Sequence, residues 1–172
     1  MYATTRIRHT LSRLKKTANR GFTLVELLIV IAIIGILTTI GVTNFQSARM
    51  RARDTKRKSD LVTIAKSLEA YANDHKLFPT SSGGKILCQP ATATVCDWGE
   101  PFTDASGTIY AAKLPEEGRD NYYYVYESAD GESFSLYARL ENEQDSAIDN
   151  TLTTECSTGI NCNYKHNSTN IE

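Results

Sequence analysis

At 172 residues and a formal net charge of −1, the chain is long enough for one small domain and too short for several large ones. The bulk of the chain is acidic, which argues against nucleic acid as its partner, because a duplex is bound chiefly through basic patches. The charges are unevenly divided, because residues 1–60 carry 12 basic and 3 acidic side chains whereas residues 61–172 carry 7 and 17.

The chain begins with a basic segment, residues 1–21, which holds six Lys or Arg and no acidic residue. The positive-inside rule predicts that this end stays in the cytoplasm and that the rest is exported. A secretory signal peptide also begins in this way, but no A-x-A-like cleavage site follows the apolar stretch. We therefore expect any cut to lie before that stretch, at Gly21, where no side chain obstructs a peptidase.

An uncharged apolar stretch follows, interrupted only by Glu26. Residues 22–42 number 21, and as a helix they would extend about 30 Å, the thickness of a bilayer's hydrocarbon core. The sequence therefore predicts a transmembrane helix. A carboxylate inside such a helix costs about 2.5–3.5 kcal/mol on insertion scales unless it is paired, which makes Glu26 the first candidate functional residue.

Residues 20–37, RGFTLVELLIVIAIIGIL, resemble the prepilin-type cleavage and methylation motif of type IV pilins and of type II secretion pseudopilins. The resemblance extends over about residues 15–80. It implies that a prepilin peptidase cuts after Gly21, that Phe22 becomes the N-methylated N-terminus, and that Glu26 sets the register of subunits in a filament.

The new amine of Phe22 would give Glu26 a partner. In hydrocarbon, a paired amine and carboxylate are far less costly than two isolated charges. The pair could form within one chain, four residues apart on the helix, or between two subunits. An ordinary signal anchor with a tolerated glutamate is the simpler alternative.

Beyond residue 42 the apolar pattern becomes one-sided. Apolar residues recur at helical spacing at Leu61, Ile64, Ala65, Leu68, Tyr71 and Ala72. No proline interrupts residues 22–76, and Phe78-Pro79 is a plausible stop. The sequence thus predicts one helix of about 55 residues, whose second half, residues 43–76, packs against a domain.

A basic cluster lies just after the predicted span. It consists of Arg49, Arg51, Arg53, Lys56, Arg57 and Lys58. A solvated helix turn is one interpretation; contact with lipid phosphates, with acidic surfaces of neighbouring subunits or with DNA is the other.

The remaining residues, 77–172, predict a β-rich head. Residues 121–140 form a predicted β-hairpin about Asp130-Gly131, and its second strand should present Phe134, Leu136, Ala138 and Leu140 to the helix. Tyr122, Tyr124 and Tyr126 alternate on the first strand, as packing residues or as a ligand surface, and residues 107–115 are a candidate third strand. The expected fold is α+β: a long N-terminal helix packed on a small antiparallel sheet with disulfide-tied loops, the lollipop shape of pilins.

Four cysteines, Cys88, Cys96, Cys156 and Cys162, all lie in the predicted head. A small exported domain with a thin core is where disulfides form and stabilise. Four cysteines allow three pairings; proximity favours Cys88 with Cys96 and Cys156 with Cys162. A zinc site is a weaker alternative, because no C-x-x-C spacing occurs.

No enzyme and no obligate cofactor are expected. The chain contains no Walker, G-x-S-x-G or H-E-x-x-H pattern, so a membrane-anchored enzyme is only a distant alternative. Residues 140–150, LENEQDSAIDN, offer oxygen ligands for Ca²⁺, and the resemblance to major pseudopilins implies a calcium site in the head. Because this loop lacks EF-hand spacing, a solvated loop is the preferred interpretation.

Together these features predict a structural subunit of a type IV pilus or pilus-like filament. A major pseudopilin of a type II secretion system is the alternative, and a membrane-anchored adhesin is an alternative of another class. The expected partners are further copies of the chain, the prepilin peptidase, the assembly machinery and the inner membrane; nucleic acid is not indicated. The subunit would cross the inner membrane once, head outside the cytoplasm, before joining an extracellular pilus or periplasmic pseudopilus.

Overall fold

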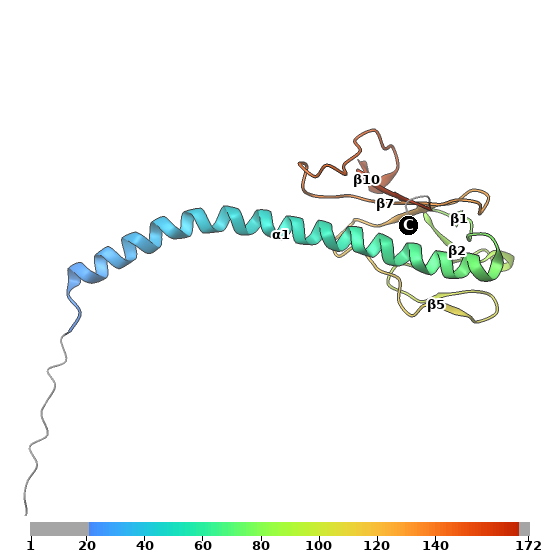
Figure 1. Ribbon diagram of the computed structural model, residues 1–172, viewed down its shortest axis with the longest axis horizontal. Helices are drawn as coiled ribbons and strands as arrows, with labels where there is room; N and C mark the ends of the chain where they lie inside the picture. Colours follow the sequence, from blue (N-terminus) through green and yellow to red (C-terminus); the bar gives the residue numbers. More distant parts are fainter. Residues whose placement is uncertain (1–20, 169–172) are drawn as a thin grey trace, which may run out of the picture. The chain divides into compact units, whose positions relative to one another are not determined.

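The computed structural model describes residues 21–168, without the side chains of residues 39–44. The predicted leader, residues 1–21, therefore lies outside the described residues except for Gly21. The chain divides into two compact units, residues 1–42 and 43–172. One helix, α1 (Leu24–His75), contributes to both units, and all strands lie in the second (Figure 1).

Short antiparallel strands make up the head, as four small sheets among the described residues. The strands are β1 (Ser81–Ser82), β2 (Lys85–Gln89), β3 (Thr94–Cys96), β4 (Phe102–Thr103), β5 (Ile109–Ala111), β6 (Val125–Glu127), β7 (Ser135–Ala138), β8 (Glu155–Ser157), β9 (Ile160–Asn161) and β10 (Tyr164–Asn167). They pair in the orders β1-β2-β3, β10-β7-β6, β4-β5 and β8-β9, and a 3₁₀ turn, η1 (Pro90–Thr92), joins β2 to β3. This confirms the α+β class, although the single predicted sheet is divided into several.

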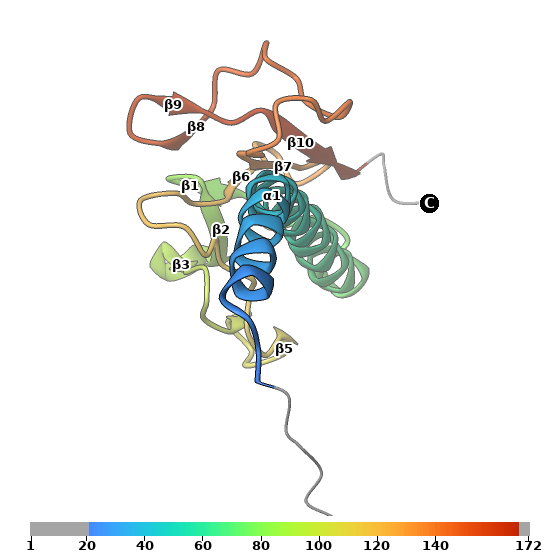
Figure 2. The same ribbon diagram turned by 90° about the vertical axis from the view of Figure 1, so that its left-hand side faces the viewer.

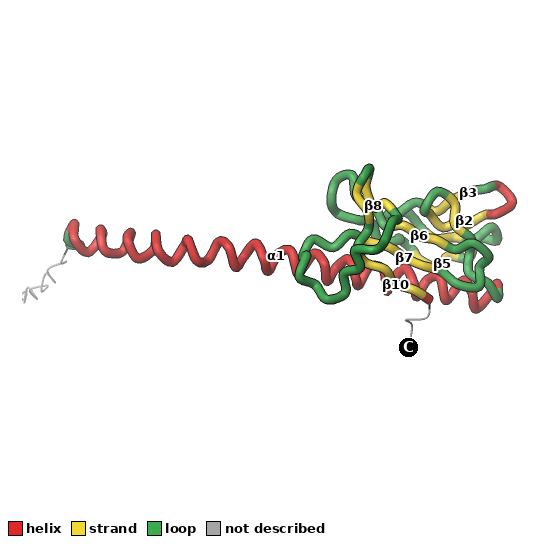
Figure 3. Tube along the Cα trace, turned by 90° about the horizontal axis from the view of Figure 1, so that it is seen from above, coloured by secondary structure: helices red, strands yellow, loops and turns green. Residues whose placement is uncertain are grey.

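The head packs on one face of the second half of α1. The predicted stripe is confirmed, since Leu61, Ile64, Ala65, Leu68 and Tyr71 are all buried in one core with residues from the strands. The helix ends at His75. The next residue, Lys76, adopts a left-handed conformation, and its backbone N–H donates to the carbonyl of Ala72 at 2.7 Å. Figure 3 shows β6, β7 and β10 lying along this part of α1.

The predicted hairpin is confirmed as β6 and β7, with Tyr126 opposite Leu136. Tyr124, Phe134 and Ala138 join these two residues in the core against α1. The hydroxyl of Tyr124 donates to Asp60 on α1 at 2.7 Å, and that of Tyr126 donates to the Pro79 carbonyl. Tyr124 and Tyr126 therefore pack the head onto the helix, as the packing interpretation of the tyrosine row predicts.

The third strand of the hairpin sheet is β10, not the predicted segment 107–115. Residues 109–111 do form a strand, β5, but it pairs with β4 in a separate sheet. β10 pairs with β7 over four residues, with His166 opposite Leu136. The sequence of β10, YKHN, does not alternate apolar and polar residues, so no sequence pattern predicts this strand. It forms because the free edge of β7 has unpaired backbone groups to which β10 can bond.

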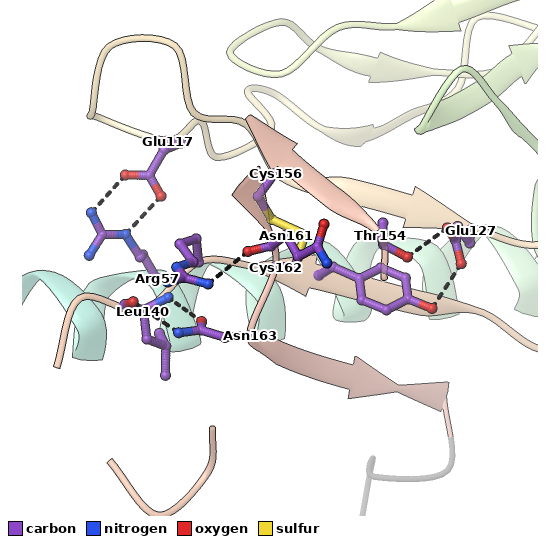
Figure 4. Close-up of a disulfide and its surroundings, with 11 residues drawn as sticks. Arg57, Glu117, Glu127, Leu140, Thr154, Cys156, Asn161, Cys162 and Asn163 are labelled. Carbon is purple, nitrogen blue, oxygen red and sulfur yellow. Dashed lines mark hydrogen bonds and ion pairs between the residues drawn. A yellow bond between two sulfur atoms is a disulfide. The ribbon is translucent and has the colours of Figure 1, made fainter. Parts of the chain in front are cut away.

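The β8–β9 hairpin covers the opposite face of the β6–β7 pair (Figure 2). Val125 and Tyr137, which point away from α1, pack there with the disulfide between Cys156 and Cys162. Next to this second core, Glu127 accepts hydrogen bonds from the Tyr137 hydroxyl at 2.8 Å and from Thr154 at 3.2 Å (Figure 4). The central sheet is thus buried on both faces.

A second disulfide joins Cys88 on β2 to Cys96 on β3, around the η1 turn. The structure therefore holds the two pairings that proximity in the sequence favours. No cysteine among the described residues is free. Cys88 and Cys96 belong to the core against α1, and Cys156 and Cys162 belong to the second core, so each bridge ties a local loop to packed residues.

Arg57 is the main polar link between α1 and the head. Its side chain is only 4% exposed and binds three carboxylates. Nη1 donates to Asp54 at 2.7 Å, Nε and Nη2 bind Glu117 in the bidentate manner at 2.8 and 2.9 Å, and Nη2 also reaches Glu141 at 2.7 Å (Figure 4 shows the Glu117 bonds). One residue of the helix thereby fixes two loops of the head.

The carboxylates around Arg57 have further partners. Asp54 accepts hydrogen bonds from the backbone N–H groups of Glu141 and Asn142 at 2.9 and 2.8 Å. Glu141 binds Arg53 as well as Arg57, and hydrogen bonds from Arg53 and then Arg57 lower the pKa of Glu141 to about 2. Arg57, Asp54 and Glu117 are buried and bonded to one another or to backbone N–H groups, the condition under which a buried ion pair is tolerated.

Three members of the predicted basic cluster bind acidic residues of the same chain, which corrects both interpretations given above for these three. Arg53 and Arg57 bind Glu141, and Lys58 binds Asp145 at 2.8 Å. These acidic partners lie more than 80 residues away in the sequence, so local patterning could not identify them. Three other members remain on the surface: Lys56 pairs with Asp60 on the helix, Arg49 lies over the ring of Phe45, and Arg51 is exposed.

We predict that Arg57→Met destabilises the head strongly. The substitution keeps most of the side-chain volume but leaves buried carboxylates without a cation, which costs about 3–5 kcal/mol. Urea unfolding of the full chain, followed by Trp98 fluorescence, measures the change. Arg51→Met, which removes an exposed arginine, is the control and should stay within about 0.5 kcal/mol of the parent. Equal stability of the two variants would contradict the proposed role of Arg57.

We also predict an acid-dependent loss of stability through Glu141. Its pKa is lower in the folded chain than its usual value near 4.5, so its contribution is complete above about pH 4.5 and disappears as the pH falls towards about 2. The contribution is about 2–3 kcal/mol. Glu141→Gln should therefore flatten the dependence of unfolding free energy on pH in this window. If the two plots of unfolding free energy against pH run parallel for the parent and the variant, Glu141 is not the source of the acid-dependent loss of stability.

Candidate functional site

Thr23 and Glu26 form a capping box at the start of α1. The backbone N–H and the hydroxyl of Thr23 both donate to Glu26 Oε2 at 2.8 Å, and the Glu26 N–H donates back to Thr23 Oγ1 at 3.2 Å. This is the T-x-x-E arrangement that satisfies the first N–H groups of a helix. Glu26 therefore has a local role besides being the sole charge of its segment, one that the spacing of Thr23 and Glu26 in the sequence indicates and that was not predicted above.

Glu26 retains binding capacity in this arrangement. Both hydrogen bonds from Thr23 go to Oε2, and Oε1 makes no hydrogen bond to any residue that the structure describes. A carboxylate offers about four lone-pair sites, so the group can cap its own helix and still accept an ammonium. The positive end of the helix dipole also favours a negative charge there.

The Gly21–Phe22 bond precedes the helix in an exposed segment. Residues 21–23 are neither helix nor strand, and Phe22 is 83% exposed. A Cβ atom added to Gly21 would meet nothing within 4 Å, and its φ lies outside the left-handed region that only glycine tolerates well. The fold of the described residues therefore does not require glycine at position 21. A requirement for glycine there would come from another molecule that binds this segment.

The helix after this bond exposes apolar side chains all round. Every large apolar residue of the segment is at least 44% exposed: Phe22, Leu24, Val25, Leu27, Leu28, Ile29, Val30, Ile31, Ile33, Ile34, Ile36 and Leu37. A continuous apolar surface of this extent marks a membrane or protein contact. Thr38, a polar residue of the segment, donates its hydroxyl back to the carbonyls of Ile34 and Gly35 at 2.9 and 3.0 Å.

No helix within the described part of the chain combines the length and apolarity of a membrane span.

The predicted site residues thus fall into two separate groups. Gly21, Phe22 and Glu26 lie together at the start of α1, whereas the four cysteines lie in the head. The candidate calcium loop, residues 140–150, directs two of its carboxylates to cations of α1: Glu141 to Arg53 and Arg57, and Asp145 to Lys58. Among residues 21–168, no three His, Cys, Asp or Glu side chains are grouped to hold a metal. Calcium binding by this loop stays a prediction.

A family model described as the prokaryotic N-terminal methylation motif matches residues 16–42. The match includes Gly21, Phe22 and Glu26 and the exposed apolar part of α1. It covers the segment in which the geometry places the accessible bond and the capping carboxylate, and it does not extend into the head.

Relatives of two kinds align over more of the chain. The chain is 31% identical to the type II secretion system core protein G of Aeromonas hydrophila over 114 residues, 65% of this chain and 76% of the relative. It is 33% identical to the type IV wide pilus major component PilA4 of Thermus thermophilus over 111 residues, 58% and 84% respectively. Against core protein G of Escherichia coli K12 the identity is 38% over 65 residues, which is 45% of that protein.

No solved structure matches the chain significantly. The family follows from the sequence relatives, two of which align over most of their own length at more than 30% identity. The methylation motif lies at the position where the structure shows an exposed bond followed by an apolar helix with a capping glutamate. The chain belongs to the family that comprises type IV pilins and the major pseudopilins of type II secretion systems.

Proposed function

We propose that this chain is a structural subunit of a pilus-like filament, made as a prepilin and cut after Gly21. The observation that carries the proposal is the exposed apolar surface of residues 22–37, which begins at the accessible Gly21–Phe22 bond. Such a surface is stable only inside a membrane or against other apolar helices. The subunit would use both environments in turn, the inner membrane first and the filament core afterwards.

The proposed role is structural and not catalytic. Its support is the family of the relatives, and in the head the Arg57 carboxylates and the four cysteines are already engaged in ion pairs and disulfides. The partners we propose are further copies of the chain, the prepilin peptidase and the assembly machinery. Before assembly, the head would lie outside the cytoplasm, an environment compatible with its two disulfides.

Processing by a peptidase accounts for Gly21 better than folding does. The open space around this residue means that a larger side chain is compatible with the fold of the described chain. A peptidase must bring its catalytic groups close to the Gly21–Phe22 bond, and a side chain at Gly21 would obstruct that approach. The requirement for glycine would then arise in the peptidase complex.

Glu26 would bind the amine that cleavage creates on Phe22. Its free Oε1 can receive the amine of an incoming subunit while Oε2 keeps the capping box. Inside an apolar helix bundle an unpaired ammonium is strongly disfavoured, so this pairing would select one axial position for each subunit. N-methylation of the amine keeps its positive charge.

Two assemblies agree with this proposal, a type IV pilus and a type II secretion pseudopilus. Relatives of both names align to similar extents, so neither is preferred. Deleting the gene in the native host distinguishes them: loss of surface fibres points to a pilus, and loss of protein secretion points to a pseudopilus. A standalone anchored adhesin, the alternative of another class, would form no filament in either case.

We predict that the mature chain from the native host has lost residues 1–21 and gained one methyl group, as measured by intact-mass analysis. Gly21→Val should block the cut because the new side chain obstructs the peptidase, although the fold of the chain is unaffected. Gly35→Ala is the matched control, since Gly35 also has open space around it and should be processed normally. A mature N-terminus beyond Val42 would rule out prepilin processing.

We predict that Glu26→Gln abolishes or slows filament assembly without preventing insertion or cleavage. Glutamine also serves in a capping box, so the variant removes the charge and keeps the helix start. An incoming amine would then be buried without a counter-charge, a loss of several kcal/mol. Sheared fractions should contain few filaments while the membrane retains cleaved subunits.

Thr38→Ala is the control for this prediction. It also removes a polar group from the apolar part of α1, but one whose hydroxyl bonds only its own helix. Filament yield should stay at the parental level. Normal filaments from Glu26→Gln would remove the proposed role of the charge and would favour a simple anchor.

A further inference from the structure

A cleft with aromatic walls lies on the head, beside the turn between β1 and β2. Its volume is about 330 Å³, and it is lined by Gly83, Gly84, Lys85, Asp97, Trp98, Tyr123 and Tyr124. We call it the aromatic cleft. None of its lining residues has a part in the proposed function.

Two glycines form one side of the aromatic cleft. Gly83 and Gly84 form the two-residue turn of the β1–β2 hairpin, with φ values of 57° and 77°. Positive φ at both positions is the requirement of the hairpin turn that Gly-Gly favours. A Cβ atom on Gly83 would meet nothing within 4 Å, so the space beside this turn is open to a ligand.

The walls are Trp98 and Tyr123, which combine apolar rings with free polar tips. Trp98 is partly buried on the core and stands edge-on to Tyr124, with ring centroids 6.1 Å apart, so its position is fixed. Tyr123 is 42% exposed. Neither Trp98 Nε1 nor the Tyr123 hydroxyl forms a hydrogen bond with a residue that the structure describes. Both tips are therefore available to a ligand.

The charges at the aromatic cleft cancel. Lys85 and Asp97 form an exposed ion pair there, and they are its only charged lining residues among those described. A neutral balance favours neither an anionic nor a cationic ligand. Lys85 can nevertheless donate hydrogen bonds to ligand hydroxyls, and Asp97 can accept them. Because an exposed ion pair is weak, each side chain can leave the other to bind a ligand.

From these features we propose that the aromatic cleft binds a neutral pyranose sugar. A pyranose ring has C–H faces that pack on aromatic rings and a rim of hydroxyls that need both donors and acceptors. The cleft offers both, at a volume within the lower range of small-molecule sites. This binding would be an activity of the head in addition to filament formation and does not depend on it.

The fluorescence of Trp98 provides a direct test, because it is the single tryptophan of the chain. The full chain is purified in a detergent without a sugar headgroup and titrated with the methyl glycosides of glucose, galactose, mannose and N-acetylglucosamine. At least one should change the Trp98 emission with saturation, at a dissociation constant on the order of 1 mM. Tyr123→Ala and Asp97→Asn should each weaken binding about tenfold.

Tyr122→Ala is the matched control, since Tyr122 is the adjacent tyrosine, stacks on Arg119 and does not line the cleft. Its affinity should equal that of the parent. The proposal is overturned if no glycoside changes the emission up to about 50 mM. It is also overturned if cyclohexanol, which has the ring but not the hydroxyl rim, binds as tightly as the sugars, or if Tyr122→Ala weakens binding as much as Tyr123→Ala.

Discussion

A buried guanidinium must be paired, and Arg57 meets this constraint by binding carboxylates from three parts of the chain. Because Glu117 and Glu141 belong to different loops, the requirement fixes both loops against the same turn of α1. The sheet between those loops then lies over the apolar stripe of the helix. The strands of the head are only two to five residues long, so strand pairing alone specifies their register weakly. The directional bonds of the Arg57 guanidinium therefore help to select one arrangement of the head.

The two halves of α1 differ in how their apolar side chains are distributed around the helix. In the second half a single apolar stripe is buried by the head, and polar residues face solvent. In the first half apolar residues point in every direction and remain exposed, so stability there has to come from a surrounding that the isolated chain lacks. The head thus buries its own apolar residues, whereas those of the first half of α1 need a membrane or other apolar helices to cover them.

The head has a small core and is stabilised by several kinds of interaction besides apolar burial. The central sheet is covered by α1 on one face and by a disulfide-bonded hairpin on the other. Cross-links and ion pairs hold the loops that apolar burial cannot hold. Much of the head surface is consequently free of a structural role. The aromatic cleft lies on such a surface, where Gly83 and Gly84 are required by the turn but leave Trp98 and Tyr123 accessible.

Features that depend on local spacing could be predicted from the amino-acid sequence alone. Helical periodicity identified the stripe from Leu61 to Tyr71, alternation identified the strands around Tyr126 and Leu136, and the isolated charge identified Glu26. Its capping partner Thr23 was equally legible and was missed. Only the tertiary structure decided which distant groups meet. The head carboxylates that bind Arg53, Arg57 and Lys58 lie 60 to 88 residues away in the sequence. β10 pairs by its position at the edge of β7. Neither ion pairing nor strand pairing has a period that a local pattern can reveal.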